Sequence, residues 1–493
     1  MSINWLQFFS QLAPWGLPLL GSMVILLVGP FWPRKHRLYF GIALAAGLAS
    51  FVWAWICWLG AKDATMYLFL FDKVTYLFAM LLAIAFIFVI LLSYAYLPSF
   101  GLVRPEYYAL LLAAFFGMGC MAAGHDLMVV FLGLEIMSVA LYVLAGFQRS
   151  NTLCVEASLK YFLIGAFASA FLLLGIAFLY GVAGNTDLLS WHERGAALFQ
   201  GPTQIYAMIG VSLVAVGIAF KIAVVPFHFW VADVYEGSPL VVTAFMATAV
   251  KVASFAALLR LVWALFQWDP VMLTQGVWVA SVLTMTLGNI SALTQKNLKR
   301  MLAYSSIAHA GYALIPLVAF SKQGPEVISA IIFYLLAYTL MTLGAFAVLV
   351  ALTEEGKEGT ELKGLAGLGS KKPFLAFMMT VFLLSLAGIP PLIGFFGKYY
   401  LFLQAIQVGS VSLVVVAVIN SVISVYYYLT PVVAMYFGSE KGTFPSESRV
   451  FPAQTVSAVI WLAFLGVACF GLFPSTLLTL ISQTARTWLI VGK

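Results

Sequence analysis

The stretch Gly217-Ile-Ala-Phe-Lys-Ile-Ala-Val-Val-Pro-Phe-His228 places a lysine, a proline and a histidine inside a long apolar run. Proline has no backbone N–H, so it interrupts the hydrogen-bond ladder of a helix. At membrane depth, backbone freed in this way is tolerated only where protein or a wet cavity covers it. The stretch therefore predicts a broken transmembrane helix that lines a polar cavity, with an ordinary proline kink as the alternative.

A second interrupted run has the same character. It reads Ala387-Gly-Ile-Pro-Pro391 and is followed by Gly397-Lys398. It lies five apolar runs further along the chain, and an odd offset reverses the orientation of a helix in the membrane. Two broken helices related in this way are typical of transporters built from inverted repeats.

The composition agrees with a membrane protein. Of the 493 residues, 63% are hydrophobic and only 9% are charged, against roughly 25% charged in a soluble domain. This composition excludes a single soluble domain, a disordered chain and a nucleic-acid-binding protein. The net charge of +7 instead indicates loops rich in Lys and Arg on one side of a membrane.

The apolar runs are continuous and do not alternate, which excludes a β-barrel and predicts an all-α polytopic protein. A crossing needs about 20 residues, and the chain contains fourteen such runs. We expect spans at 12–32, 38–59, 74–97, 107–123, 127–147, 159–182, 206–230, 240–266, 271–293, 301–320, 327–352, 374–406, 411–437 and 456–481. Among the connections after odd-numbered spans, the longest, 353–372, is charged and Gly-rich, and is the best candidate for a flexible segment.

The basic residues indicate the orientation. Connections after odd-numbered spans carry 14 Lys and Arg residues, and the opposite side carries 6. The side richer in Lys and Arg is cytoplasmic, so both termini are expected in the periplasm.

Five basic residues remain, and all lie within or at the edge of an apolar span. They are Lys160, Lys221, Lys251, Arg260 and Lys398. A charge at the bilayer centre costs at least about 2.5–3.5 kcal/mol, so such residues usually mark ion or proton pathways. For Lys160, which can reach the interface, and for Arg260 a structural role is favoured.

One acid, Glu135 in Phe131-Leu-Gly-Leu-Glu-Ile136, also lies in the middle of a span. Burial disfavours the charged form of a lysine, and a nearby carboxylate restores it. We therefore expect Glu135 and Lys221 to be partners in a proton relay that includes Lys251 and Lys398. The alternative is a static salt bridge between helices.

Two histidines and four cysteines complete the set of candidate residues. His228 follows the first break and His309 lies in an apolar helix; both are possible relay residues because imidazole titrates near neutral pH, although packing roles are the alternative. The cysteines, Cys57, Cys120, Cys154 and Cys469, have no metal-ligand spacing. No nucleotide-binding motif is present, so any redox chemistry is expected on another chain.

Several of these motifs resemble the antiporter-like subunits of respiratory complex I. They are Arg104-Pro-Glu-Tyr-Tyr108, Phe131–Ile136, Glu156-Ala-Ser-Leu-Lys-Tyr-Phe162, Lys221–His228, Ser305-Ser-Ile-Ala-His-Ala-Gly-Tyr312, and Ser385–Pro391 with Phe396-Gly-Lys398. The run Pro226-Phe-His-Phe-Trp-Val-Ala-Asp-Val-Tyr-Glu-Gly-Ser-Pro239 is the most specific, and its Asp-Val-Tyr-Glu-Gly form is similar to the N-type subunits. Lys398 argues against the M type, which has Glu there. One departure is Ala249-Val250-Lys251, where many relatives have Gly-Pro-Lys, which puts the local helix shape in question.

The resemblance implies fourteen helices with two inverted five-helix repeats, in which the seventh and twelfth helices are broken. It divides the chain into N-terminal helices at 1–105, a first repeat at 106–267, a second repeat at 268–438 and a C-terminal helix at 439–493. It also implies that Glu135, Lys221, Lys251 and Lys398 translocate protons, while His228 and His309 match further polar positions.

The implied function is that of a proton-translocating membrane subunit of NADH-quinone oxidoreductase, in the bacterial inner membrane. No cofactor or metal is expected in this chain; FMN and iron–sulfur clusters are expected in partner subunits. Its partners would be other membrane-arm subunits, both antiporter-like and small helical ones, and the lipid bilayer. The alternatives are a subunit of an Mrp-type Na⁺/H⁺ antiporter and the equivalent subunit of a ferredoxin- or coenzyme-fed dehydrogenase.

Overall fold

The computed structural model describes residues 5–33, 35–60, 64–66, 68–198, 201–265, 270–438 and 453–488. Arg34, Lys62, Lys441, Arg449 and Lys493, which contribute to the expected orientation, lie outside these residues. Helices dominate the described chain. In order they are α1 (Trp5–Val28), α2 (His36–Gly60), α3 (Lys73–Ser99), α4 (Pro105–Ala123), α5 (Leu127–Ala145), α6 (Thr152–Ala183), α7 (Leu188–Leu198), α8 (Gln204–Ile222), α9 (Val231–Gly237), α10 (Leu240–Leu265), α11 (Pro270–Leu293), α12 (Leu298–Leu314), α13 (Phe320–Ala351), α14 (Leu368–Lys371), α15 (Pro373–Ala387), α16 (Ile393–Gln407), α17 (Val411–Phe437), α18 (Gln454–Leu472) and α19 (Pro474–Trp488).

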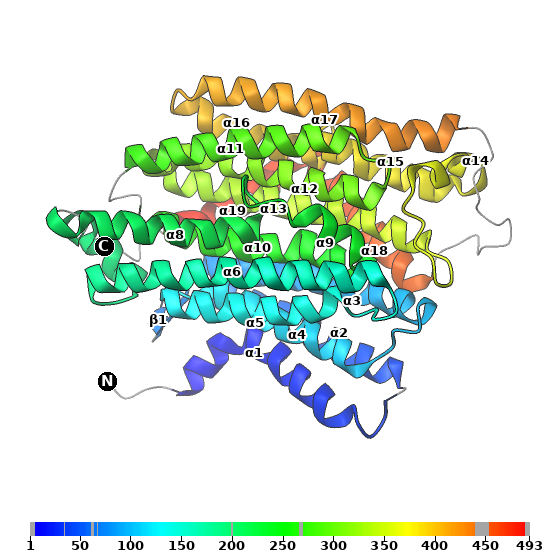
Figure 1. Cartoon of the computed structure of the whole chain (residues 1–493), viewed down its shortest axis with the longest axis horizontal. Helices are drawn as coiled ribbons and strands as arrows, with labels where there is room; N and C mark the ends of the chain where they lie inside the picture. The colour runs from blue at the N-terminus through cyan, green and yellow to red at the C-terminus, as the bar shows by residue number, and fades with distance from the viewer. Residues whose placement is uncertain are drawn as a thin grey trace.

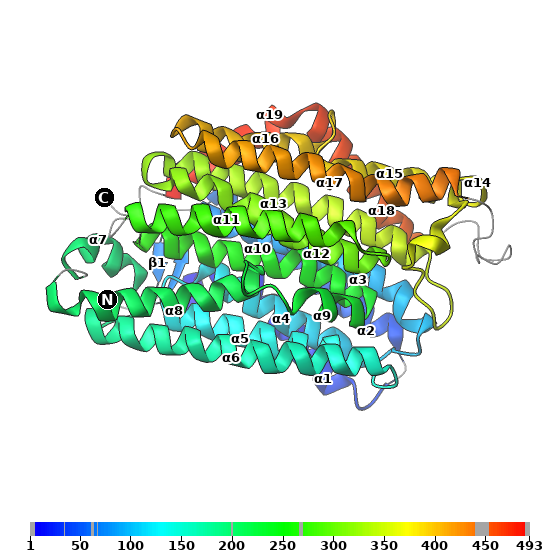
Figure 2. The same cartoon turned by 45° about the horizontal axis from the view of Figure 1, so that its top comes forward.

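Short elements connect some of these helices. Three are 3₁₀ turns, η1 (Gly201–Thr203), η2 (Ile315–Ala319) and η3 (Leu362–Leu365). Between α2 and α3, strand β1 (Ala64–Met66) pairs antiparallel with β2 (Phe69–Phe71). The long helices lie side by side along one direction, with α7 at one end of the bundle and α14 at the other (Figures 1 and 2).

The helices account for fourteen crossings. Twelve described segments are long and apolar enough to cross a membrane. One of them, Leu298–Ala351, has 54 residues, more than twice the length that a crossing needs, and it contains both α12 and α13. The broken pair α15–α16 provides one more crossing, because neither half is long enough alone. The predicted all-α polytopic fold is thus confirmed.

The middle of the bundle is formed by α10 and α13. In α10, the whole central apolar window is buried inside the protein, whereas in α1 and α2 about a quarter of the window is buried. Helices that are apolar on every side and carry a few ionisable groups therefore occupy the interior. Their charges face protein and not lipid.

The chain follows a similar order in its two halves. In the first, α4, α5 and α6 are followed by a broken helix and α10; in the second, α11, α12 and α13 are followed by a broken helix and α17. The third helix of each set, α6 and α13, has 32 residues. This order is what two five-helix repeats would give, and the division at 106–267 and 268–438 stays a prediction.

Two details differ from expectation. The last predicted span, 456–481, ends early: α18 stops at Leu472, and α19 begins separately at Pro474 because proline cannot continue the ladder. The connection 353–372, expected to be flexible, is fixed by backbone hydrogen bonds from Leu298 to Thr360 and from Leu362 to Lys296.

Candidate functional site

The first break confirms the predicted interruption around Pro226. Helix α8 ends at Ile222 and α9 begins at Val231, with Ala223 in the left-handed region at φ 69°. Side chains bond to the backbone at the break: Thr284 Oγ1 accepts from the Val225 N–H at 3.1 Å, and the Trp230 indole donates to the Phe220 carbonyl at 3.2 Å. The accompanying expectation of buried water stays a prediction.

Lys221 lies one residue before the end of α8 and is 2% exposed. Its ammonium lies 5.2 Å and 5.1 Å from the ring centroids of Tyr142 and Tyr161. Such cation–π contacts are worth up to about 2 kcal/mol when desolvated. The ammonium also donates to the Tyr142 hydroxyl at 3.4 Å, so it is held by aromatic faces and one long hydrogen bond.

Glu135 lies on α5, and its Oε1 is buried without a hydrogen-bond partner. No ion pair joins its side chain to Lys221 in the described part of the chain, and the expected partnership of the two in a proton relay stays a prediction. Instead Glu135 interacts electrostatically with both Lys221 and Tyr142. Tyr142 is seven residues from Glu135, which places both on the same face of α5. The Tyr142 hydroxyl thus contacts the lysine from the helix that carries the acid.

Lys251 lies in the middle of α10 and is 3% exposed. Its ammonium donates to the Ser306 carbonyl of α12 and lies 5.8 Å from the centre of the Tyr338 ring of α13. Helix α10 continues through this position, so Ala249-Val250 in place of Gly-Pro gives an unbroken helix.

His309 on α12 connects the central lysine with the last one. It is buried, and its two ring nitrogens hydrogen-bond to the hydroxyls of Tyr334 and Tyr428 at 2.6 Å and 2.9 Å. It interacts electrostatically with both Lys251 and Lys398. An imidazole with two hydroxyl partners can accept a proton on one side and release one on the other.

The second break also confirms its prediction. Helix α15 ends at Ala387, Gly388 adopts φ 90°, and α16 begins at Ile393. Lys398 donates to the freed Ala387 carbonyl at 2.8 Å and to Ser421 Oγ at 2.9 Å. Its ammonium lies 5.0 Å from the centre of the Tyr312 ring. The break thus supplies an acceptor for the lysine.

Tyrosines link these groups, and the sequence reasoning did not single them out. Tyr161, which packs on Lys221, lies near Tyr235, and Tyr235 lies near Tyr338 beside Lys251. We use the name polar axis for Glu135, Lys221, Lys251, His309 and Lys398 together with the tyrosines beside them. These tyrosines are Tyr142, Tyr161, Tyr235, Tyr334, Tyr338 and Tyr428. The seven-residue spacing of Glu135 and Tyr142 was a signal that could have revealed the first of these tyrosines.

His228, by contrast, is not joined to the polar axis. It lies half-buried in the first break, and its Nδ1 is among the buried atoms without a hydrogen-bond partner in the described part of the chain. Its proposed relay role therefore rests on its position alone.

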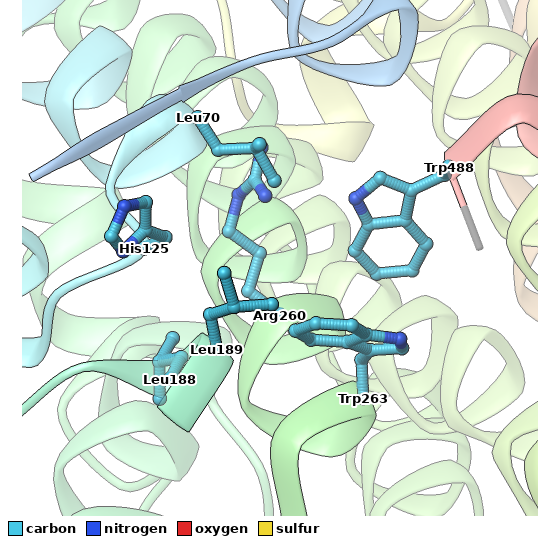
Figure 3. A pocket seen from close by; sticks show the side chains of 7 residues that line it. All are labelled: Leu70, His125, Leu188, Leu189, Arg260, Trp263 and Trp488. Carbon is cyan, nitrogen blue, oxygen red and sulfur yellow. The ribbon is translucent and has the colours of Figure 1, made fainter. Parts of the chain in front are cut away.

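Lys160 and Arg260 have structural partners, as favoured from the sequence. Lys160 pairs with Glu156 at 2.7 Å and with Asp233 at 2.8 Å. The Arg260 guanidinium donates to the Ala122 carbonyl at 2.7 Å and lies 3.6 Å from Asp72. Figure 3 shows Arg260 beside a cavity of only about 10 Å³, too small for a ligand larger than a water molecule.

Within the described residues, no group of three or more His, Cys, Asp or Glu side chains could hold a metal ion. The ionisable groups of the polar axis are instead spaced along the interior of a membrane bundle and connected by hydroxyl and imidazole groups. Groups of this kind can pass protons between them. The fold and the site together define an antiporter-like membrane subunit.

Comparisons with known proteins identify the family. Residues 124–424 match the family described as NADH:quinone oxidoreductase/Mrp antiporter, TM. NADH-quinone oxidoreductase subunit N of Trichlorobacter lovleyi is 42% identical over 477 residues, covering 94% of this chain and 93% of that protein. The chain therefore belongs to the NADH:quinone oxidoreductase/Mrp antiporter family, within its subunit N branch, as the motifs predicted.

Solved structures agree. A chain of respiratory complex I from Thermus thermophilus with bound aureothin is 35% identical and has a TM-score of 0.79, covering 94% of this chain and 98% of that one. A chain of the Mrp complex from Dietzia sp. DQ12-45-1b has a TM-score of 0.84 at 23% identity. At that identity the second likeness shows the shared fold alone.

Proposed function

We propose that this chain translocates protons in the membrane arm of an NADH-quinone oxidoreductase, driven by quinone reduction elsewhere in the complex. The observation that carries the proposal is the polar axis, in which four of its ionisable groups, Lys221, Lys251, His309 and Lys398, are at most 5% exposed. Hydroxyls and an imidazole lie between these groups. A static salt bridge between helices would need one pair of opposite charges, whereas the polar axis has three lysines and a single acid.

The proposal includes the remaining features expected from the sequence. The chain carries no redox centre of its own, and FMN and iron–sulfur clusters belong to partner subunits. Its partners are other membrane-arm subunits in a bacterial inner membrane. The excess of basic residues after odd-numbered spans supports periplasmic termini.

The Mrp-type antiporter and the ferredoxin- or coenzyme-fed enzyme remain the alternatives for the complex. The 42% identity to a subunit N over nearly the full length favours the quinone-linked complex. Copurification separates them, because an Mrp assembly would bring no flavin or iron–sulfur subunits.

The test of proton translocation is Glu135→Gln in the assembled complex. Opposite charges about 4 Å apart interact by about 4 kcal/mol at an effective dielectric near 20, and the separation through Tyr142 makes the effect here smaller. Removing the acid still leaves Lys221 without its only nearby negative charge among the described residues. We expect proton pumping to fall strongly and quinone reduction to fall with it.

The control is Glu135→Asp, which keeps the charge and should be milder. Pumping is measured as acidification of inside-out membrane vesicles, and assembly as copurification with partner chains. Wild-type pumping by an assembled Glu135→Gln complex would refute the relay.

A further inference from the structure

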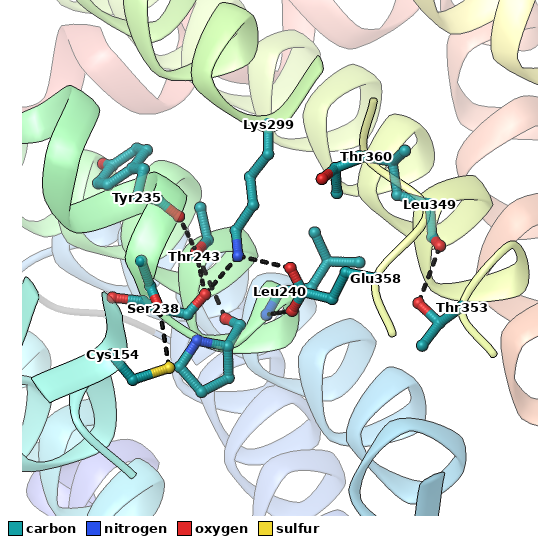
Figure 4. A network of polar contacts seen from close by, with 12 residues as sticks. Cys154, Tyr235, Ser238, Leu240, Thr243, Lys299, Leu349, Thr353, Glu358 and Thr360 are labelled. Carbon is teal, nitrogen blue, oxygen red and sulfur yellow. Dashed lines mark hydrogen bonds and ion pairs between the residues drawn. The ribbon is translucent and has the colours of Figure 1, made fainter. Parts of the chain in front are cut away.

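At the end of the bundle that carries α14, a buried lysine pairs with a partly exposed glutamate of the connection 353–372. Lys299 is the second residue of α12 and is 1% exposed, and Glu358 lies in the connection 353–372. The Lys299 ammonium lies 2.8 Å from Glu358 Oε2 and also donates to the Ser238 carbonyl. Figure 4 shows the pair among Tyr235, Ser238 and Thr243.

The Glu358 carboxylate holds four parts of the chain together. Its Oε1 accepts from the Tyr96 hydroxyl of α3 at 2.5 Å and from the Leu240 N–H at 2.8 Å. Leu240 is the first residue of α10, so this N–H has no partner within its own helix. Both oxygens are thus bonded, and the carboxylate joins α3, α10, α12 and the connection.

A structural tie alone does not require charge. Replacing a buried ion pair by apolar residues is often neutral or stabilising. Stability alone therefore does not require the charges of Glu358 and Lys299.

On its outer side the pair borders two cavities, of about 150 Å³ and 230 Å³, both lined by Glu358. Lys299 lines the larger one, and exposed Lys357 lies at the rim of both. Both are far larger than a water molecule, so aqueous protons can reach the carboxylate.

On its inner side the pair leads to the polar axis. Lys299 and His309 lie on one helix, ten residues apart, which is about 15 Å and half the thickness of a hydrocarbon core. Ser306 lies between them along α12, and its buried hydroxyl has no hydrogen-bond partner among the described residues. Tyr235 lies next to that hydroxyl, and the Ser306 carbonyl accepts from Lys251.

We propose that Glu358 and Lys299 form a gate through which protons enter the polar axis, an inference that rests on the proposed function. A proton from the cavity binds the Glu358 carboxylate and removes the charge that holds Lys299. The Lys299 ammonium then gives one proton inward along α12, past the Ser306 hydroxyl, to a neutral Lys251. Lys299 regains a proton from Glu358, so both gate residues return to their charged forms and one proton has moved inward.

Other ionisable groups face the gate from each neighbouring element. Those in contact or in electrostatic interaction with Glu358 are Lys299, Tyr96 and Cys154, and those that line the adjoining cavities are Glu236, Glu354, Lys357 and Glu361. Glu358 is distinguished among the acids by its direct contact with a fully buried lysine.

The test is Glu358→Gln in the assembled complex, with Glu355→Gln as the matched control because Glu355 is exposed on the same connection. Inside-out vesicles place this end of the bundle in the medium, and pumping is measured across a range of medium pH. We expect Glu358→Gln to lower pumping by about tenfold or more, as for loss of a proton-transferring group. The loss should grow as the medium becomes more alkaline, because proton collection then limits the rate. Glu355→Gln should pump like the wild type, and Glu358→Asp should recover part of the activity.

An assembled Glu358→Gln complex with the wild-type pH profile would overturn the gate, and so would a loss that is equal at every pH and not recovered by Glu358→Asp. Glu135→Gln is measured in the same preparation. If only Glu135→Gln loses pumping, the gate fails and the proposed function stands. If neither variant loses pumping, the proposed function fails.

Discussion

The two broken helices place a lysine on opposite sides of their breaks. Lys221 lies just before the break, at the end of α8, whereas Lys398 follows the break, in the second turn of α16. At the first break an indole donates to the Phe220 carbonyl, which also accepts from the Ala223 N–H, whereas at the second break the lysine itself donates to the Ala387 carbonyl. The acid Glu135 interacts with the first lysine only.

This difference gives the two lysines different roles. Lys398 satisfies the backbone of its own helix, so its ammonium is part of the structure. Lys221 rests against aromatic rings with one long hydrogen bond, and nothing in the backbone requires its charge. We therefore infer that the proton affinity of Lys221 changes more readily than that of Lys398, whose ammonium is held more firmly.

The largest expected contrast comes from Lys398→Met and Lys221→Met. Both variants should lose proton pumping. Lys398→Met also leaves the buried Ala387 carbonyl without its lysine partner, which costs about 1–3 kcal/mol, whereas methionine fits the aromatic surroundings of Lys221 at little cost. The temperature at which the purified complex loses its assembled form on native gels should fall more for Lys398→Met. Equal shifts would contradict the distinction between the two breaks.

A smaller effect is expected for Tyr142→Phe, which removes the hydroxyl that joins Lys221 to the Glu135 side. One such hydrogen bond is worth about 1 kcal/mol, so pumping should fall several-fold. Tyr107→Phe is the control, because its buried hydroxyl bonds to Ser93 at 2.8 Å outside the polar axis. Tyr107→Phe should alter stability similarly and leave pumping unchanged, and a matching loss in both variants would remove Tyr142 from the pathway.

The smallest contrast concerns the residue that follows the first half of each broken helix, Ala223 after α8 and Gly388 after α15. Gly388→Ala places a Cβ at φ 90° and within 3.0 Å of the Lys398 side chain, which should cost about 1–2 kcal/mol. Ala223→Gly relieves about 1 kcal/mol of strain at φ 69° but removes a buried methyl group worth about 0.8 kcal/mol. Thermal unfolding should therefore shift down for Gly388→Ala and hardly change for Ala223→Gly. A clear loss of stability with Ala223→Gly would show that the methyl group dominates there.

Much of the fold could be predicted, because hydropathy and proline breaks are local properties of the chain. The fourteen crossings and both breaks were predicted at nearly the right residues. The end of the last crossing was missed, because the apolar content continues past Leu472 into α19 and only Pro474 marks the boundary.

The sequence by itself determined which ionisable residues lie at membrane depth. A lysine or glutamate within an apolar run enters the membrane with the apolar residues on either side of it. Only the tertiary structure decided their partners. The contact of Tyr142 with Lys221, and that of Lys299 with Glu358, both depend on side chains from helices or loops that meet in space. Hydropathy cannot predict such neighbours, because it averages over a single segment. A hydrogen bond instead requires two groups placed within about 3 Å by the packing of separate helices.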